Sequence, residues 1–438
     1  MSAVPLPIRT DVPARRAHGT PIAGSVIVEP GEAEDRAARI GSRLDRLFEI
    51  DRAAGTNRPG LGDGEERAFE FVRGWMDEAG LEVSSDHAGN LYGRAAGHGG
   101  ALPEVWSGSH LDTPPDGGRL DGALGVLAAL DAAEAIRRTG GAERTLAVVA
   151  FRLEEGWRFG RGVFGSRALC GQLEPDEADL RDADGISLGE AFSALGLGEL
   201  PATGWLAPGP ASYLEAHIEQ GPVLAAEGVP VGVVTSIAGM AGLELAFTGR
   251  RGHAGTVPME LRSDALAAAA GFVVSAHAVA AAIPGAVATI GRLSVEPGAT
   301  NTIPNRTVLF ADVRAPDDAR LGELVGGVDN AARQAAQGAR CTVEISPRWR
   351  YPSTPMSEAP TAAVRRAVAA LGGEPFELAS GAGHDAQILG MAGVPVAMLF
   401  VRSDADGVSH APEESTGADA IAACVRVLEP ALRELLSA

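Results

Sequence analysis

Three consecutive stretches decide the fold of this chain: EVWSGSHLDT (104–113), GALGVLAALDAAEAIRRTG (122–140) and TLAVVAFRLEE (145–155). The first and third are apolar runs of strand length that end in polar residues, and the second is an alanine-rich amphipathic pattern closed by a glycine. A strand, a helix and a strand in succession predict a doubly wound α/β sheet. Ligands gather at the carboxyl ends of strands in such sheets. We therefore expect the polar residues that close the two strands to form a site.

Beyond this unit, the predicted order of strands and helices changes twice along the chain. Strands alternate with helices before residue 231 and after residue 346, whereas the segment between them combines two long helices with about four strands. We therefore predict an α/β domain with an α+β domain inserted into it. The expected boundaries are a flexible N-terminal extension at 1–30, a discontinuous catalytic, metal-binding domain at 31–230 and 347–438, and the inserted domain at 231–346.

Length and charge limit the possible partners. The chain has 438 residues, 45% of them hydrophobic and 21% charged, which suits two globular domains with sizeable cores. Its 37 basic and 57 acidic residues give a net charge of −20. Nucleic acid and anionic membrane surfaces are therefore disfavoured as partners.

Two residue types exclude whole classes of chemistry. The sequence contains no lysine, so all 37 basic residues are arginine, and Schiff-base, P-loop and Ser–Lys chemistries are excluded. Its three cysteines, Cys170, Cys341 and Cys424, lie far apart and form no CxxC pair. Neither a disulfide framework nor a thiolate zinc site is therefore expected.

The sequence also predicts a location. We find no apolar stretch that approaches the roughly 18 residues of a membrane span. Residues 1–30 contain arginines but no apolar run of signal-peptide length. We therefore expect a cytoplasmic protein that does not enter a membrane.

Histidines and carboxylates at the strand ends predict a metal-dependent site. The segment LDTPPDGGRL between His110 and Asp121 contains two prolines and two glycines, so it can fold back and bring both side chains together. Glu154 and Glu155 are adjacent at the other strand end, where neighbouring side chains point to opposite faces. One could ligate a metal while the other faces substrate. Carboxylates with imidazoles and no thiolate suit zinc, manganese or cobalt.

Eight motifs in order give the chain a family resemblance. They are GSHLDTPPDGGRLDGALGV (108–126), EEGWRFGRGVFGSRALCG (154–171), EAHIEQGPVL (215–224), GHAGTVPMELRSDAL (252–266), ATNTIPN (299–305), DVR (312–314), SGAGHDA (380–386) and GVSHAPEE (407–414). The sequence resembles the binuclear-zinc amidases that include N-carbamoyl-L-amino acid hydrolase, β-ureidopropionase and allantoate amidohydrolase, in the zinc carboxypeptidase and aminoacylase-like superfamily. The resemblance extends from about residue 32 to the C-terminus.

The resemblance implies a metal centre and a general base. Two divalent ions would be bridged by Asp121, with zinc as the first choice and manganese or cobalt as substitutes. The implied ligands are His110 and His217 at one ion and Glu155 and His410 at the other. Glu154 would be the catalytic general base, and Asp112 would orient His110. A cis peptide bond between Asp121 and Gly122 is implied as well.

The resemblance also implies how substrate is held. The substrate-side residues would be Gln220, His253, Asn301, Arg314, Gly381, Ala382 and His384. Three of these lie in the inserted domain, so contacts with the small-molecule substrate would be completed on domain or subunit closure. The inserted domain would act as a lid and as the dimerisation domain of a homodimer. Trp157 and Pro114 depart from the family pattern near the metal ligands, where they could change the substrate pocket.

The expected activity is hydrolysis of a linear carbon–nitrogen bond other than a peptide bond. The substrate would be an N-carbamoyl-L-amino acid or a related ureido acid such as allantoate or ureidopropionate. Two alternatives remain open, an aminoacylase or dipeptidase of the same fold and a metal-binding protein that has lost catalysis. His217 weighs against the first, because peptidase relatives are expected to use a carboxylate there, and the presence of Glu154 weighs against the second.

Overall fold

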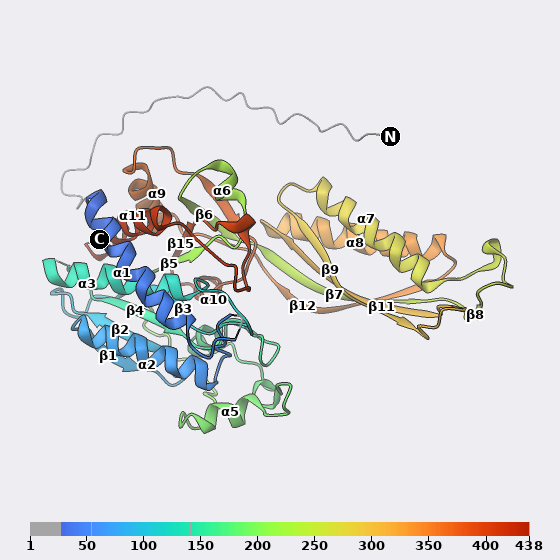
Figure 1. Cartoon of the computed structure of the whole chain (residues 1–438), viewed down its shortest axis with the longest axis horizontal. Helices are drawn as coiled ribbons and strands as arrows, with labels where there is room; N and C mark the ends of the chain where they lie inside the picture. Colours follow the sequence, from blue (N-terminus) through green and yellow to red (C-terminus); the bar gives the residue numbers. More distant parts are fainter. Residues whose placement is uncertain (1–27, 54, 141, 438) are drawn as a thin grey trace.

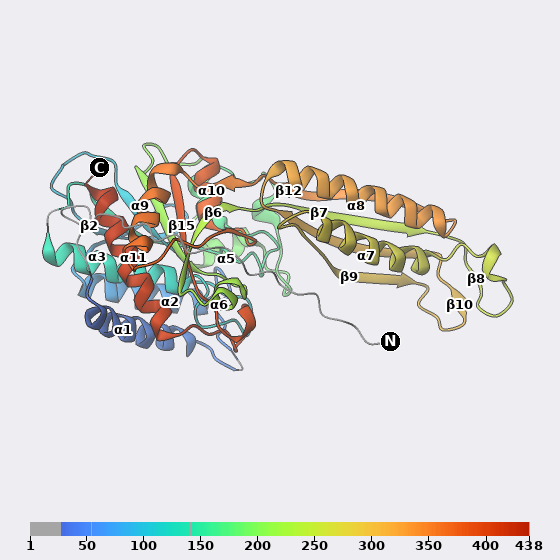
Figure 2. The same cartoon turned by 90° about the horizontal axis from the view of Figure 1, so that it is seen from above.

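A computed structural model describes residues 28–53, 55–140 and 142–437. These residues form a larger lobe, which contains both ends of the described chain, and an elongated smaller lobe that projects from it (Figures 1 and 2). Residues 1–27, most of the expected N-terminal extension, lie outside the described residues.

The larger lobe is built on a nine-stranded sheet with the order β1-β2-β4-β3-β5-β15-β6-β13, in which β14 also pairs with β6. Its centre is parallel: β3 pairs in parallel with β4 and β5, and β15 pairs in parallel with β5. The strands are β1 (Glu82–Ser85), β2 (Leu91–Ala95), β3 (Val105–His110), β4 (Leu146–Phe151), β5 (Ser212–Ile218), β6 (Val231–Ile237), β13 (Thr354–Pro355), β14 (Glu377–Ser380) and β15 (Val396–Val401).

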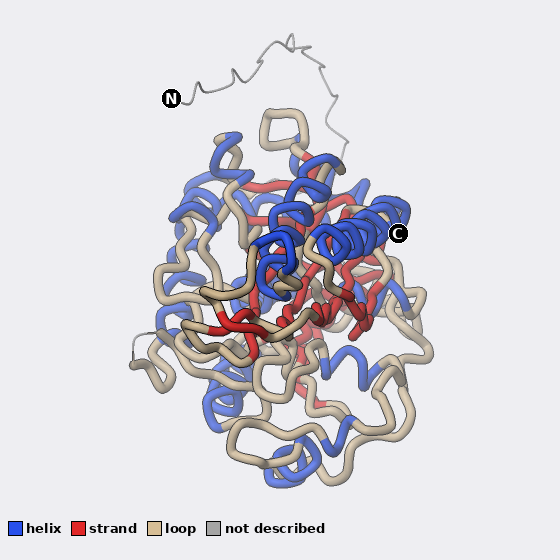
Figure 3. The backbone as a smooth tube through the Cα atoms, turned by 90° about the vertical axis from the view of Figure 1, so that its right-hand side faces the viewer, coloured by secondary structure: helices blue, strands red, loops and turns tan. Residues whose placement is uncertain are grey.

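Helices cover both faces of this sheet. On one face, α2, α3, α9 and α11 pack against the strands in the largest apolar core, and α1 packs on α3 and α11. On the other face, α4 and α10 pack in a second core. Viewed along the long axis, the strands lie toward the centre with most helices around them (Figure 3). The helices of the lobe are α1 (Pro30–Phe48), α2 (Asp63–Glu78), α3 (Ala123–Thr139), α4 (Phe164–Leu169), α5 (Leu188–Ala194), α6 (Val223–Glu227), α9 (Glu358–Ala369), α10 (Asp385–Met391) and α11 (Ala418–Leu436), with 3₁₀ turns at Glu177–Asp179 and Ala405–Gly407. The predicted doubly wound α/β fold is confirmed.

The number of sheet faces covered by helices explains the hydrophobic patterns of the strands. Every residue of β3 and β4 is buried, because helices lie on both faces, and this is why their sequences are continuous apolar runs. Strand β11 (Arg306–Ala315) of the smaller lobe alternates strictly between buried and partly exposed residues after its first position. That alternation is typical of a sheet covered on one face only.

The smaller lobe is a four-stranded antiparallel sheet, β12-β7-β11-β9, with α7 and α8 on one face. Strands β8 (Gly252–His253) and β10 (Thr302–Ile303) pair at its far tip (Figure 2). The remaining elements are β7 (Gly239–Thr248), β9 (Val287–Glu296), β12 (Thr342–Tyr351), α7 (Ala265–Ala282), α8 (Asp318–Gly338) and a 3₁₀ turn at Met259–Leu261. This is the α+β character expected of the insert.

The strands of the insert differ in detail from expectation. The insert was expected to begin at residue 231, but β6 belongs to the larger sheet and the smaller sheet begins only with β7. At the other end β12 runs to Tyr351, beyond the expected boundary at 346. Both differences arise because an apolar strand sequence does not specify which sheet it joins.

Helix α7 corrects the expectation about apolar stretches. Among the described residues it is the one helix long and apolar enough to cross a membrane, with a mean hydropathy of 1.8 over 18 residues. One such helix is weak evidence for a membrane span, because length and composition are the only criteria that it meets. It packs on the sheet through residues such as Phe272 and Ala276, and its outer side leaves Val274 exposed.

Candidate metal centre

The expected ligands come together where the central strands end. His110 is the last residue of β3, His217 is the second-last residue of β5, and Asp121 lies two residues before α3. Glu155 follows β4, and His410 lies in the loop between β15 and α11. The carboxyl ends of parallel strands meet at one edge of the sheet, so residues far apart in sequence reach one point.

Two groups of three ligand atoms share Asp121. In the buried triad, Oδ1 of Asp121 lies 3.6 Å from Nε2 of His110 and 3.2 Å from Nε2 of His217. In the outer triad, Nε2 of His410 lies 3.2 Å from Oδ2 of Asp121 and 3.3 Å from Oε2 of Glu155. Asp121 therefore presents one carboxylate oxygen to each group.

These spacings fit a divalent metal ion. Bonds of about 2.0–2.1 Å in tetrahedral geometry place neighbouring ligand atoms roughly 3.3 Å apart, close to the separations in both triads. Oε1 of Glu155 is buried without a hydrogen-bond partner, and ion coordination would satisfy it. All donors are imidazole nitrogens or carboxylate oxygens, as zinc, manganese and cobalt prefer.

Other groups fix the orientation of the ligands. Nδ1 of His110 lies 3.2 Å from the Asp112 carbonyl oxygen and 3.3 Å from its carboxylate, and Nδ1 of His217 lies 2.9 Å from the Ile218 carbonyl. These contacts hold a proton on Nδ1 and leave Nε2 as the metal-facing atom. The Asp112 carboxylate also accepts the backbone N–H groups of Glu154 and Glu155, at 2.9 and 3.1 Å. Asp112 therefore orients one ligand directly and positions both glutamates.

The protein groups alone create a strongly perturbed electrostatic environment. Burial disfavours the charged form of Asp121, but hydrogen bonds from His110, His217 and His410 outweigh it and hold the pKa of Asp121 well below its usual value. Burial also opposes protonation of His110, yet Glu154 and the neighbouring aspartates raise the pKa of His110 well above normal. A divalent cation would replace these protons, because it supplies the positive charge that the carboxylates attract.

Glu154 and Glu155 differ in their surroundings. Glu155 contributes to the outer triad, whereas Glu154 belongs to neither triad and lines the cavity, with Oε2 3.8 Å from Nε2 of His110. Burial raises the pKa of Glu154 to about 7; His110 opposes this shift, and Asp112 and Asp121 add to it. A carboxylate with a pKa near neutrality can accept and return a proton.

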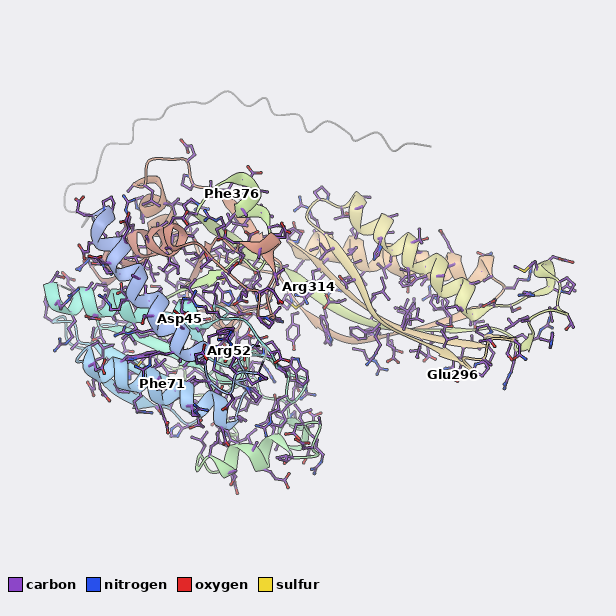
Figure 4. The ribbon with its side chains drawn as sticks, in the orientation of Figure 1. Asp45, Arg52, Phe71, Glu296, Arg314 and Phe376 are labelled. Atoms are coloured by element: carbon purple, nitrogen blue, oxygen red, sulfur yellow. The ribbon has the colours of Figure 1, made fainter. Side chains whose placement is uncertain are left out.

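The cavity beside the triads has a volume of about 270 Å³ and lies between the lobes. Gln220, Ala382 and His384 line it from the larger lobe, and Arg314 lines it from β11 of the smaller lobe, at the junction labelled in Figure 4. Nε2 of Gln220 donates to Oδ2 of Asp121 at 2.8 Å. Burial, followed by the neighbouring His217, lowers the pKa of His384 well below its usual value, so its ring is neutral.

Arg314 is held in place at the lobe junction. Its Nε and Nη2 atoms donate to the two carboxylate oxygens of Asp312, at 2.8 and 2.9 Å, and Nη1 donates to the Gly381 carbonyl at 2.9 Å. Three of the five N–H donors of its guanidinium group are thus used, which leaves two for a ligand. Gly381 acts here as a support for Arg314.

Two expected substrate residues are remote from this cavity. His253 lies in β8 and Asn301 next to β10, at the far tip of the smaller lobe (Figure 1), and both are exposed. They are neighbours, since Ala254 N–H donates to the Asn301 carbonyl at 2.9 Å. Within one chain the structure does not bring them to the metal ligands.

Three further expectations are corrected or refined. The Asp121–Gly122 peptide bond is trans: the cis bonds in the described part of the chain are Ala207–Pro208 and Glu296–Pro297. Gly122 has a φ of 62°, which favours glycine, and a Cβ at this position would lie only 2.6 Å from the His110 ring. Trp157 and Pro114 do not line the cavity, so they do not shape it directly.

Sequence reasoning did not single out the buried acid Glu414. Its Oε1 accepts the backbone N–H groups of Leu120 and Asp121, at 2.6 and 3.0 Å, and its Oε2 accepts the Ser409 hydroxyl at 2.8 Å. It therefore joins the loop that presents Asp121 to the loop that presents His410. The available signal was its place at the end of the GVSHAPEE motif (407–414).

Comparison with known proteins agrees with this geometry. Residues 106–434 match the family described as peptidase family M20/M25/M40. The chain belongs to the M20 family. It is 39% identical, over 86% of its length and 93% of the relative's, to an N-carbamoyl-L-amino acid amidohydrolase of Geobacillus stearothermophilus. It is 32% identical to an allantoate deiminase of Arabidopsis thaliana, over 89% of this chain and 80% of that protein.

The M20 assignment extends to solved structures. A crystal structure of an amidase of the hydantoinase/carbamoylase family from Burkholderia multivorans superimposes with a TM-score of 0.84 at 31% identity. The alignment covers 92% of this chain and 98% of that one. The resemblance seen in the sequence motifs is thereby confirmed, and so is the fold of a metal-dependent hydrolase with an inserted domain.

Proposed function

We propose that this chain hydrolyses the linear ureido bond of an N-carbamoyl-L-amino acid or a related ureido acid, and releases the amine, carbon dioxide and ammonia. The observation that carries the proposal is the arrangement around one cavity. Glu154 stands beside two ligand triads that share Asp121, and Arg314 lies across from them. The relatives named as N-carbamoyl-L-amino acid amidohydrolase and allantoate deiminase support it.

The proposed cofactor is a pair of divalent ions, zinc by preference, with manganese or cobalt able to substitute. His110, His217 and Asp121 would hold one ion, and Asp121, Glu155 and His410 the other. When bound, such a pair lowers the pKa of a coordinated water and polarises a carbonyl group.

The chain's own residues would do the rest of the chemistry. Arg314 binds the substrate carboxylate with its two remaining N–H donors. Glu154 accepts a proton from the attacking water and returns it to the leaving nitrogen. His384 is neutral, so it offers substrate a hydrogen-bonding ring without adding charge, and Gln220 and the backbone of Ala382 provide further polar groups.

We further propose a homodimer that forms through the smaller lobe. Strand β9 is at the edge of its sheet, and it leaves Val287 and Leu293 exposed, while Val274 is 72% exposed on α7. A partner could cover this surface, and His253 and Asn301 could then approach the partner's cavity. Light scattering should give twice the monomer mass of 44.8 kDa, and a fully active monomer would contradict the proposal.

A cytoplasmic location is part of the proposal as well. The three cysteines are free, which is typical of proteins in a reducing compartment. Fractionation of cells that express residues 1–438 without an added tag would test this location. Recovery outside the cytoplasm would overturn it.

One assay separates the candidate activities. Ammonia release is measured from N-carbamoyl amino acids, allantoate and ureidopropionate, beside cleavage of dipeptides and N-acetyl amino acids. We expect turnover of ureido acids, its loss after chelation, and its recovery with zinc, manganese or cobalt. Turnover restricted to dipeptides or N-acetyl amino acids would favour the aminoacylase or dipeptidase alternative, and full turnover in metal-free protein would overturn the metal-dependent mechanism.

A further inference from the structure

The sheet of the smaller lobe presents one open face, and part of that face lines the cavity. Tyr351 on β12 pairs with Met240 on β7, which pairs in turn with Arg314 on β11. Residues directly opposite each other in a sheet share a face, so these three side chains form one row. All three line the cavity. The row therefore places an apolar surface beside the guanidinium group.

The helix-covered face of the same strands confirms which way the row points. In β7 the odd-numbered residues Ala241, Leu243, Leu245 and Phe247 pack in the core under α7 and α8. In β11 the odd-numbered Leu309, Ala311, Val313 and Ala315 do the same. The even-numbered residues, which include Met240 and Arg314, must therefore point to the opposite, open face.

A β-bulge adds aromatic side chains to this face. The register of β12 against β7 shifts between Pro347 and Trp349. Before the shift, Val343 and Ile345 face the helices. Trp349 and Tyr351 are also odd-numbered, so in a regular strand they would face the helices too. The extra residue turns both rings to the open face.

Tyr351 lines the cavity, and the rings of Trp349 and Phe310 extend the same face outward beyond that lining. The Trp349 ring centroid lies 6.1 Å from that of Tyr351 and 6.4 Å from that of Phe310. Both Trp349 and Phe310 crowd the space over Gly242, where a Cβ would lie 2.4 Å from Trp349 and 2.7 Å from Phe310. We call Phe310, Trp349 and Tyr351 the aromatic strip; all three are half-buried.

Two apolar side chains of the larger lobe, Val163 and Ile388, line the cavity together with Met240 and Tyr351 of the smaller lobe. These four form the apolar wall of a lining that also contains Gln387. The metal ligands and Glu154 would engage the ureido group and Arg314 the carboxylate. The substituent on the carbon between those two groups is therefore left to the apolar wall.

We propose that the aromatic strip, together with Met240, binds the side chain of the substrate, and that the favoured substrates are N-carbamoyl amino acids with aromatic or long aliphatic side chains. This inference rests on the proposed ureido hydrolysis and narrows its substrate class. Allantoate has a second ureido group in place of the side chain, and an apolar wall leaves its hydrogen-bonding groups unsatisfied. Allantoate is therefore a poor substrate.

The test compares kcat/KM for N-carbamoylglycine, N-carbamoylphenylalanine and allantoate. The phenylalanine derivative should exceed the glycine derivative by about 10- to 100-fold, the range that one apolar contact region provides. Trp349→Ala should reduce this ratio roughly tenfold, mainly through KM, while Trp349→Phe should retain most of it. Phe71→Ala is the matched control, because Phe71 lies on α2 of the larger lobe, on the side away from Arg314 (Figure 4).

The outcomes distinguish this inference from the proposed function. A ratio near one in the unaltered protein, or a ratio unchanged in Trp349→Ala, would overturn the role of the strip even if ureido acids are hydrolysed. If only N-acetyl amino acids are cleaved, the proposed function fails and the same side-chain series on N-acetyl substrates decides the role of the strip. Equilibrium dialysis of the ligands with Glu154→Gln measures the preference without turnover.

Discussion

The two ligand triads share Asp121 but are built differently. In the buried triad His110 and His217 are each 2% exposed, whereas the His410 side chain of the outer triad is 51% exposed. The two buried histidines come from β3 and β5, and their Nδ1 atoms are held by backbone carbonyls. His410 comes from a loop and has a φ of 55°, unusual for a residue other than glycine.

This difference shows that two kinds of structure, strand ends and a loop, position the two triads. Strand ends fix the buried triad because neighbouring strands and helices enclose them. The outer triad depends on a loop that must be held from elsewhere, and Glu414 holds it by joining the loops of Asp121 and His410. We therefore expect an ion in the outer triad to exchange more readily than an ion in the buried one.

The largest expected effect comes from Glu154, which belongs to neither triad. Glu154→Gln should lower kcat by about 100- to 10,000-fold, because it removes the proton acceptor. The metal content of the variant, measured by mass spectrometry, should equal that of the unaltered protein. Loss of an ion would show that Glu154 and Glu155 have exchanged roles.

Substitution of one histidine in each triad tests the comparison directly. His217→Ala should lose the ion of the buried triad and lower the melting temperature, since it opens a cavity among buried side chains. His410→Ala should lose about one ion per chain and leave the melting temperature of the metal-free protein nearly unchanged. Equal destabilisation by both changes would remove the distinction between the triads.

The pH profile should fall on its acid side. Glu154 must be ionised to accept a proton, and burial raises its pKa to about 7 among the protein groups. Bound cations favour the ionised form and lower that pKa, so kcat/KM should decline, roughly tenfold per pH unit, below a midpoint at or under pH 7. A profile that stays flat from pH 8 to well below 4.5, the ordinary pKa of a glutamate, would contradict Glu154 as the base.

Glu414→Gln has the smallest expected effect, and it tests the outer triad. Glutamine keeps the size but has one acceptor oxygen where Glu414 uses two, so the link between the loops weakens. Metal affinity of the outer triad should fall by about 10- to 100-fold, as for other groups that orient ligands. The neighbouring Glu413 is exposed, so Glu413→Gln is the matched control and should change neither affinity nor activity.

Much of the site could be predicted from sequence because its residues close recognisable strands. The apolar runs before His110 and Glu154 predict buried strands, and buried parallel strands end at one edge. Glu414 could not be predicted in the same way. Its function depends on the backbone N–H groups of Leu120 and Asp121, almost 300 positions away in sequence.

The sequence by itself determined the fold class and the family, and it predicted which residues gather as candidate metal ligands, because local patterns of apolar runs, turns and motifs carry this information. The tertiary structure alone decided which oxygen of Asp121 faces which triad, which sheet β6 joins, and that His253 lies far from Arg314. It also decided the face of Trp349 and Tyr351, since one extra residue in β12 reverses the side of every residue after it. Such a shift depends on pairing with β7, and the sequence of β12 alone does not contain it.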